Sequence, residues 1–163
     1  MDLLERGEAD LIITIESYVR GDFPQTHLFD DDHSLICWRE SAHRNGVSMD
    51  AFCAAGHAMT YFGPTRAAAF SEVYFETHGI ERRADVLVPS FAMLPGAVIG
   101  TDRLATMQSR FAEYFARTLP IEVLPLPFEF PKVREVAQWH SKRGQDAGLQ
   151  WLVQVVREHA ARL

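Results

Sequence analysis

The sequence has few of the features that mark disulfide-stabilised or nucleic-acid-binding proteins. It contains only two cysteines, Cys37 and Cys53, which lie in apolar surroundings and without the spacing of a metal site. Two buried thiols are therefore favoured over a disulfide. The 16 Lys and Arg residues are scattered, their densest group is the pair Lys142-Arg143, and the formal net charge is −6. The chain thus lacks the basic stripe that unaided binding to nucleic acid requires.

Long apolar runs are also missing. None approaches the roughly 20 residues that a membrane-spanning helix needs. The N-terminus carries Asp2 and Glu5 where a signal peptide would have a basic and then an apolar region. We therefore expect a soluble, cytoplasmic protein with no membrane partner.

Motifs of nucleophilic or metal-dependent enzymes are absent as well. No G-x-S-x-G elbow surrounds Ser90, and no third group is evident that would orient a histidine base for Ser90 or Cys37. The cluster His27, Asp30, Asp31, Asp32 and His33 invites a metal interpretation. However, successive side chains of an extended chain point to opposite faces, so three consecutive aspartates cannot converge on one ion. We expect a solvated turn there, no metal, no cofactor and no enzymatic activity.

What the sequence does contain is apolar segments in alternating strand and helix patterns. Hydrophobic residues make up 47% of the 163 residues, enough for the core of one domain or of two small lobes. Strands are expected at 9–14, 26–29, 33–39, 57–62, 84–88, 104–107, 121–126 and 132–140. Helices are expected after the N-cap Ser48 and at 66–78, 91–99, 109–117 and 146–161. This alternation predicts an α/β fold with a largely parallel sheet.

Two further expectations concern burial. The strand at 9–14 has the composition of one buried on both faces of a parallel sheet, and residues 2–7 before it look like the end of a helix stopped by Gly7. Aromatic residues at helical spacing are expected in the core, namely Phe70, Tyr74, Phe111, Phe115 and Trp151.

Candidate binding residues follow the apolar runs, because ligands of doubly wound sheets bind outside the carboxyl ends of the strands. They are Thr14, Glu16, Gly63, Pro64, Thr65, Ser90 and Phe91, and the same rule brings in Thr106 and Gln108. Thr65 and Ser90 are expected to start helices, where free N–H groups favour a carboxylate or another anion. For Thr14, contact with a ligand and a hydroxyl bond to its own backbone are equally supported.

Four blocks of the sequence resemble the effector-binding domain of LysR-type transcriptional regulators, in particular the branch of nodulation and aromatic-catabolism regulators. The blocks are Leu3 to Ile12 (LLERGEADLI), the turn Val88-Pro89-Ser90-Phe91, Gly100 to Thr106 (GTDRLAT), and Trp139-His140 followed by Asp146, Gly148, Trp151 and Leu152. Their order and spacing agree with the family along essentially the whole chain.

The resemblance implies a two-lobe fold like that of the periplasmic binding proteins, with a small effector held in the cleft between the lobes. Lobe I would comprise residues 1–41 and 132–163, and lobe II residues 42–131. Lobe I would be incomplete, because family members carry its first elements, a linker helix and a winged helix-turn-helix before the point where this chain starts. The resemblance also implies that Ser90, Ala137 and Gln138 line the effector cleft.

The preferred hypothesis is therefore the effector-binding regulatory domain of a LysR-type transcription factor, sensing a small acidic or aromatic molecule. DNA would be contacted only through the domain that this chain lacks. A free-standing solute-binding or subunit-interaction protein with the same fold is the alternative, and a small enzyme on the same sheet is a third hypothesis. Because an incomplete lobe I would expose the apolar strand edge at 11–14, we also expect self-association into a homo-oligomer.

Overall fold

The computed structural model describes residues 2–162 and divides into two compact units. Unit 1 consists of two segments, the one up to Asp31 and the one from Lys132 onward. Unit 2 is Asp32–Pro131. The chain enters unit 2 just before strand β3 (His33–Trp38) and returns to unit 1 at Lys132. Strand β3 lies in unit 2 because it pairs with strands of that unit along both of its edges.

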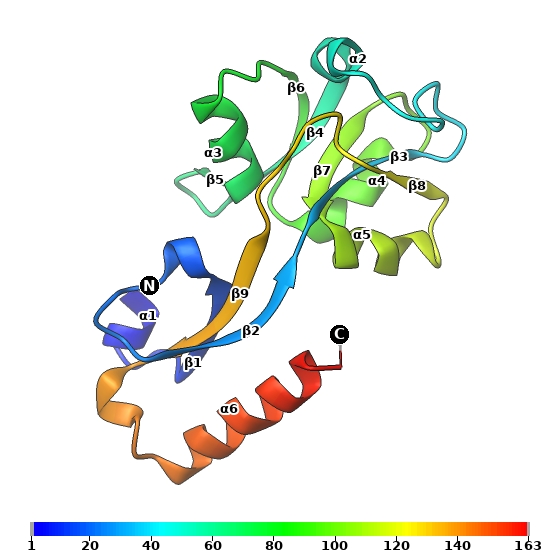
Figure 1. Ribbon diagram of the computed structural model, residues 1–163. Coiled ribbons are helices and arrows are strands. Elements are labelled where there is room, and N and C mark those ends of the chain that lie inside the picture. Colours follow the sequence, from blue (N-terminus) through cyan, green and yellow to red (C-terminus); the bar gives the residue numbers. More distant parts are fainter. Residues whose placement is uncertain (1, 163) are drawn as a thin grey trace. The chain divides into compact units, whose positions relative to one another are not determined.

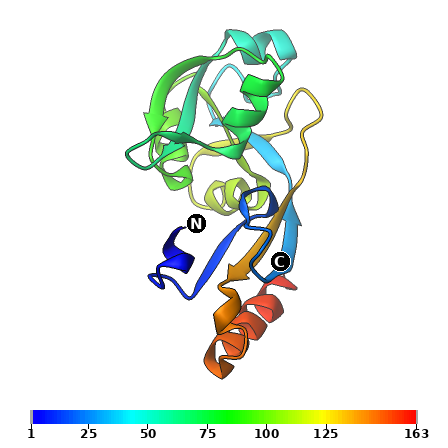
Figure 2. The same ribbon diagram turned by 90° about the vertical axis from the view of Figure 1, so that its left-hand side faces the viewer.

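Unit 1 is built on a three-stranded antiparallel sheet in the order β1-β9-β2. Its elements are α1 (Asp2–Glu5), β1 (Leu11–Ile15), η1 (Glu16–Tyr18), β2 (Gln25–Asp31), β9 (Val133–Trp139), η3 (Ser141–Arg143) and α6 (Ala147–Ala160). Leu149 and Val153 of α6 pack on Trp139 of β9, so the C-terminal helix covers this small sheet (Figure 2).

Unit 2 contains a mixed sheet in the order β5-β4-β7-β3-β8, with β6 paired to β4 (Figure 1). The strands are β4 (Gly56–Phe62), β5 (Ala67–Ala68), β6 (Arg83–Val88), β7 (Leu104–Gln108) and β8 (Ile121–Leu124). Strands β6 and β7 run parallel to β4, while β3 runs antiparallel to both β7 and β8.

Helices cover both faces of the unit 2 sheet, and each face has its own core. Helices α4 (Leu94–Val98) and α5 (Ser109–Ala116) close one core around Ile36 and Met107. Helices α2 (Met49–Ala54) and α3 (Phe70–Thr77) supply Phe52 and Phe75 to the other, which also contains Leu35, Cys37 and Leu104. Neighbouring residues of β3 therefore serve opposite cores, which explains why Leu35, Ile36 and Cys37 are apolar in succession.

Local signals in the sequence set several helix ends as predicted. The Ser48 hydroxyl accepts a hydrogen bond from Ala51 N at 3.2 Å, and the Asp146 carboxylate accepts one from Leu149 N at 2.8 Å. These side chains cap α2 and α6. Gly79 adopts φ +66° just after α3, the left-handed conformation that ends many helices.

The expectation of a largely parallel sheet is wrong. Within the described part of the chain, only the pairings of β4 with β6 and β7 are parallel, and β1 is an edge strand in which Ile13 is 56% exposed. It was expected to be buried on both faces. The chain leaves unit 1 along β2 and returns along β9, so these two neighbouring strands must run in opposite directions.

The start of helix α3 and the buried face of helix α6 also differ from expectation. Helix α3 begins at Phe70 because residues 67–68 pair with the end of β4 as strand β5, and its buried residues include Phe75. Helix α6 buries Leu149, Val153 and Ala160, a stripe at spacings of four and seven, and leaves Trp151 68% exposed. Trp151 is therefore not a core residue.

Both thiols are free, with Cys37 buried and Cys53 half-buried, which confirms the prediction of two thiols in place of a disulfide. In residues 2–162, no helix has the length and the apolar character needed to cross a membrane.

Gln138 of β9 provides a test of what holds unit 1 together. Its side chain is fully buried, its Oε1 accepts a hydrogen bond from Arg20 N at 3.1 Å, and its Nε2 donates to Arg20 O at 2.7 Å and to Phe23 O at 3.4 Å. We expect Gln138→Leu to lower the free energy of unfolding by about 1–3 kcal/mol, because backbone groups of the 20–23 loop lose their partners. Urea denaturation measures this change. Gln154→Leu, on the exposed side of α6, is the matched control, and equal midpoints for the two variants would show that the amide is not a structural clamp.

Candidate functional site

The carboxyl ends of the parallel strands of unit 2 meet at one edge of its sheet. Strands β4, β6 and β7 end at Phe62, Val88 and Gln108, and the antiparallel β3 begins at the same edge, with His33 opposite Gln108. The rings of Phe62 and Phe91 lie 5.4 Å apart between centroids, so the end of β4 is in contact with the segment after β6. Of the residues that the rule about strand ends selected, Phe91 therefore lies beside the end of β4, and Gln108 lies opposite the start of β3.

A group of polar side chains with buried polar atoms lies at this edge on the α3 face of the sheet. His33 and Gln108 are cross-strand neighbours, and Thr106, opposite Leu35, points to the same face. Among the described residues, no hydrogen-bond partner reaches His33 Nδ1, Thr106 Oγ1 or Gln108 Oε1. An unpaired buried polar atom costs about 1–3 kcal/mol, so three of them at one strand edge require an explanation.

Aromatic rings enclose the imidazole of His33. Its centroid lies 4.6 Å from that of Phe130 and 6.1 Å from that of Phe70, the first residue of α3. Burial lowers the pKa of His33 from its usual 6.5 to about 4, an effect that the charge of Asp32 only partly opposes. The ring is therefore neutral at pH 7, with one nitrogen that donates and one that accepts.

The opposite face of the same edge carries hydroxyl groups. Ser34 Oγ and Ser109 Oγ lie 2.6 Å apart, and Ser109 N donates to Asp32 O at 2.8 Å. Thr60 is buried here beside Val88, its pairing partner in β6, and the described residues offer its Oγ1 no partner. The edge can therefore offer hydrogen bonds to a ligand from both faces.

Ser90 and the turn after β4 differ from expectation in local structure. The Ser90 hydroxyl accepts a hydrogen bond from Ala92 N at 3.3 Å, but it starts the 3-10 turn η2 (Phe91–Met93), which leads into the short α4. This weakens the helix-dipole argument for an anion, because the turn and α4 do not form one continuous α-helix. Gly63, Pro64 and Thr65 form the exposed tip of the β4–β5 hairpin, so Thr65 does not cap α3.

The remaining candidates lie in unit 1. Thr14 pairs with Val136 across the β1–β9 ladder, and the carboxylate of Glu16 accepts a hydrogen bond from the Arg134 guanidinium at 3.2 Å. Ala137 is fully buried, and the amide of the neighbouring Gln138 is taken up by the 20–23 loop.

The segment from His27 to His33 is not the solvated turn that was expected. Asp31 closes β2 with 7% exposure, and His33 opens β3 at 8%. Sequence reasoning missed His33 because it grouped this residue with the aspartates before it. The signal that identifies it is strand alternation, since His33 shares the face of Leu35 and Cys37. Within residues 2–162, no three His, Cys, Asp or Glu side chains are placed to hold a metal ion.

Comparison with known proteins identifies a family. A family model described as the LysR substrate binding domain matches residues 1–161. Nodulation protein D 2 of Sinorhizobium fredii is 32% identical over 160 residues, 98% of this chain and 51% of the relative. Nodulation protein D of Azorhizobium caulinodans is 32% identical over 163 residues, 99% of this chain and 52% of the relative. The chain thus spans about half the length of these curated relatives.

Among solved structures, the regulatory domain of MexT, a transcriptional activator in Pseudomonas aeruginosa, matches with a TM-score of 0.80. The two chains are 20% identical, and the match covers 96% of this chain and 76% of that one. This likeness confirms the predicted α/β fold of the periplasmic-binding-protein-like type.

The buried histidines predict how stability depends on pH. Burial lowers the pKa of His57, as of His33, from 6.5 to about 4. The unfolded chain therefore takes up protons between about pH 6.5 and 4 that the folded chain refuses, so stability that is complete above this range is lost as the pH falls through it. The loss is about 3 kcal/mol for each histidine.

Urea denaturation at pH 7.5 and 4.5 measures this loss. In the variant His33→Phe, the decrease in stability between these two pH values that comes from buried histidines should be about half as large, because only His57 still contributes to it. The surface variant His78→Gln is the matched control. An unchanged pH dependence in His33→Phe would mean that His33 is not buried as a neutral group.

Proposed function

We propose, since this chain belongs to the LysR substrate-binding domain family, that it binds a small-molecule effector at the carboxyl edge of the unit 2 sheet. The observation that carries the proposal is the set of unpaired polar atoms on His33, Thr106 and Gln108. A ligand that hydrogen-bonds to these atoms would offset the cost of burying them.

The surroundings of these atoms indicate the chemistry of the effector. The polar groups are a neutral imidazole, a hydroxyl and an amide, and the rings of Phe70 and Phe130 lie against the imidazole. Such a site suits an aromatic molecule with hydroxyl or carboxyl groups, because the rings stack and the polar groups donate and accept. Ser90 and Phe91 lie at the same edge and complete the proposed set in unit 2.

Access to the site links binding to a change in structure. The unpaired atoms on His33, Thr106 and Gln108 are shielded from solvent, so a ligand reaches them only when neighbouring side chains move. Asp32, where the chain enters unit 2, is hydrogen-bonded through its carbonyl to Ser109, the residue after Gln108. An effector at this edge would thus favour one arrangement of the segment that connects the units.

At the level of the whole protein, we propose that the chain is the sensing part of a transcriptional regulator. Its family is one of transcriptional regulators, and we propose no enzymatic activity for the chain. DNA binding would depend on a domain outside this chain and would take place in the cytoplasm. In unit 1, Thr14 and Glu16 are further candidate contacts because they end or follow the strand expected at 9–14, and Ala137 and Gln138 are further candidates because of the resemblance to the family.

A thermal-shift screen of aromatic and aliphatic acids tests this proposal. We expect aromatic acids to raise the melting temperature through preferential binding to the folded state. For the best acid, Thr106→Val and Ser90→Ala should each weaken binding by about 1–3 kcal/mol in calorimetry, because a polar ligand group loses its partner. Thr118→Val, an exposed threonine after α5, is the matched control. Equal affinity in all three variants would place the effector elsewhere.

We further propose that two copies of the chain associate along β1. This strand is at the edge of its sheet and exposes Ile13, and an unpaired apolar edge recruits other strands. Sedimentation velocity should show a concentration-dependent dimer, and Ile13→Lys should shift the equilibrium to the monomer. A chain that stays monomeric at high concentration would refute this proposal.

A further inference from the structure

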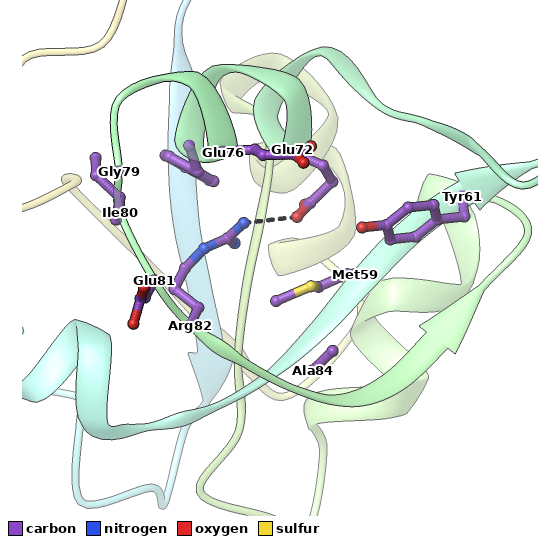
Figure 3. Close-up of a pocket in the computed structure, with 10 residues that line it drawn as sticks. Met59, Tyr61, Glu72, Glu76, Gly79, Ile80, Glu81, Arg82 and Ala84 are labelled. Atoms are coloured by element: carbon purple, nitrogen blue, oxygen red, sulfur yellow. Dashed lines mark hydrogen bonds and ion pairs between the residues drawn. The ribbon is translucent and has the colours of Figure 1, made fainter.

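A cavity in unit 2 shares no residue with the proposed effector site. It has a volume of about 420 Å³ and lies between α3, β4, β6 and the 79–82 loop (Figure 3). Met59, Phe75, Ile80 and Ala84 give it apolar walls, and the phenol of Tyr61 projects into it towards Glu72.

A buried ion pair forms the floor of this cavity. Arg82 Nη2 donates to Glu72 Oε2 at 2.6 Å, and each side chain is only 5% exposed. The guanidinium carbon lies 3.9 Å from the ring centroid of Phe75, which fixes its plane. Such a pair is costly to bury and contributes little net stability, so its presence beside a cavity points to a role beyond folding.

The ion pair leaves hydrogen-bonding capacity unused. Arg82 Nε has no acceptor among residues 2–162, although the side chain is almost wholly buried. Glu72 accepts only from Arg82 and, at the long distance of 3.4 Å, from the Ser71 hydroxyl. A carboxylate can accept about four hydrogen bonds. The floor therefore offers both a donor and acceptor positions to a molecule in the cavity.

The charge of the lining selects the sign of that molecule. The charge of Arg82 is balanced by Glu72, whereas Glu76 and Glu81 add two further carboxylates to the lining. Both are exposed, so their carboxylates lie at the rim. The cavity consequently attracts cations, and its apolar walls favour one with a hydrophobic body.

We propose that this cavity is a second binding site, for a small organic amine that has an apolar body and a carbonyl acceptor, such as an amino acid amide. The ammonium group contacts Glu76 and the Tyr61 hydroxyl, the carbonyl accepts from the Arg82 guanidinium, and the apolar body packs against Met59 and Ile80. The regulatory chain would then respond to two molecules of opposite charge at separate sites.

Calorimetry with three related probes tests each part of the site. Phenylalaninamide has all three features, 3-phenylpropionamide lacks the ammonium, and 2-phenylethylamine lacks the carbonyl. We expect phenylalaninamide to bind and each of the other two to bind at least tenfold more weakly. Equal binding of phenylalaninamide and 3-phenylpropionamide, or no binding of phenylalaninamide at millimolar concentration, would overturn the proposal.

Variants locate the binding on the protein. Glu76→Gln and Tyr61→Phe leave the buried ion pair intact and should weaken phenylalaninamide binding about fivefold or more. Glu113→Gln, an exposed glutamate on α5, is the matched control. Thr106→Val should leave amine binding unchanged, which separates this site from the effector site. Equal affinity of Glu76→Gln, Tyr61→Phe and Glu113→Gln would show that the amine binds elsewhere.

Discussion

The antiparallel pairing of β3 with β7 is the constraint on which the rest of unit 2 depends. Its register sets His33 opposite Gln108 and Leu35 opposite Thr106. The three polar side chains therefore share one face of the sheet with the hydrophobic core around Leu35. A slip of one residue would turn every side chain of β3 to the other face and bury Ser34 where Leu35 now packs. The cores on both faces therefore fix the positions of the polar groups at the strand edge.

The sequence predicted the elements of this fold more reliably than their pairing. Caps such as Ser48 and Asp146 act within a few residues, and their hydrogen bonds are present as expected. The directions of neighbouring strands depend on which distant segments meet, and no local pattern in Leu11–Ile15 distinguishes an antiparallel edge strand from a buried parallel one. Helix α3 starts late for the same reason, since residues 67–68 are taken by pairing with β4.

The candidate site was predicted in part. The rule that ligands bind at strand ends selected Ser90, Phe91, Thr106 and Gln108, because strand ends can be read from hydrophobicity. The rule did not select His33, because it considers the residues that follow strands and His33 is the first residue of β3. It lies at this edge because β3 is antiparallel to β7, which the sequence did not indicate. Gln138 was proposed from the resemblance to the family, and its hydrogen bonds to the 20–23 loop could not be predicted because they join segments far apart in the sequence.

The buried amide of Gln138 in unit 1 differs from the buried polar side chains discussed in unit 2. The Gln138 amide is satisfied by backbone groups, as expected of a structural residue. In unit 2 the groups around His33 and the guanidinium of Arg82 keep unused capacity at two separate places. In unit 1, Trp139 Nε1 also lacks a partner among the described residues, so the contrast concerns these particular side chains and not the two units as wholes.

The most direct test of the account is the nitrogen NMR spectrum of the His33 imidazole, recorded without ligand and at saturation with the best acid from the screen. The account predicts a neutral ring at pH 6 in both states and a change in the Nδ1 chemical shift on binding, with the His57 ring unaffected. A charged His33 ring at pH 6 in the free chain, or an Nδ1 shift that stays constant at saturation, would contradict it.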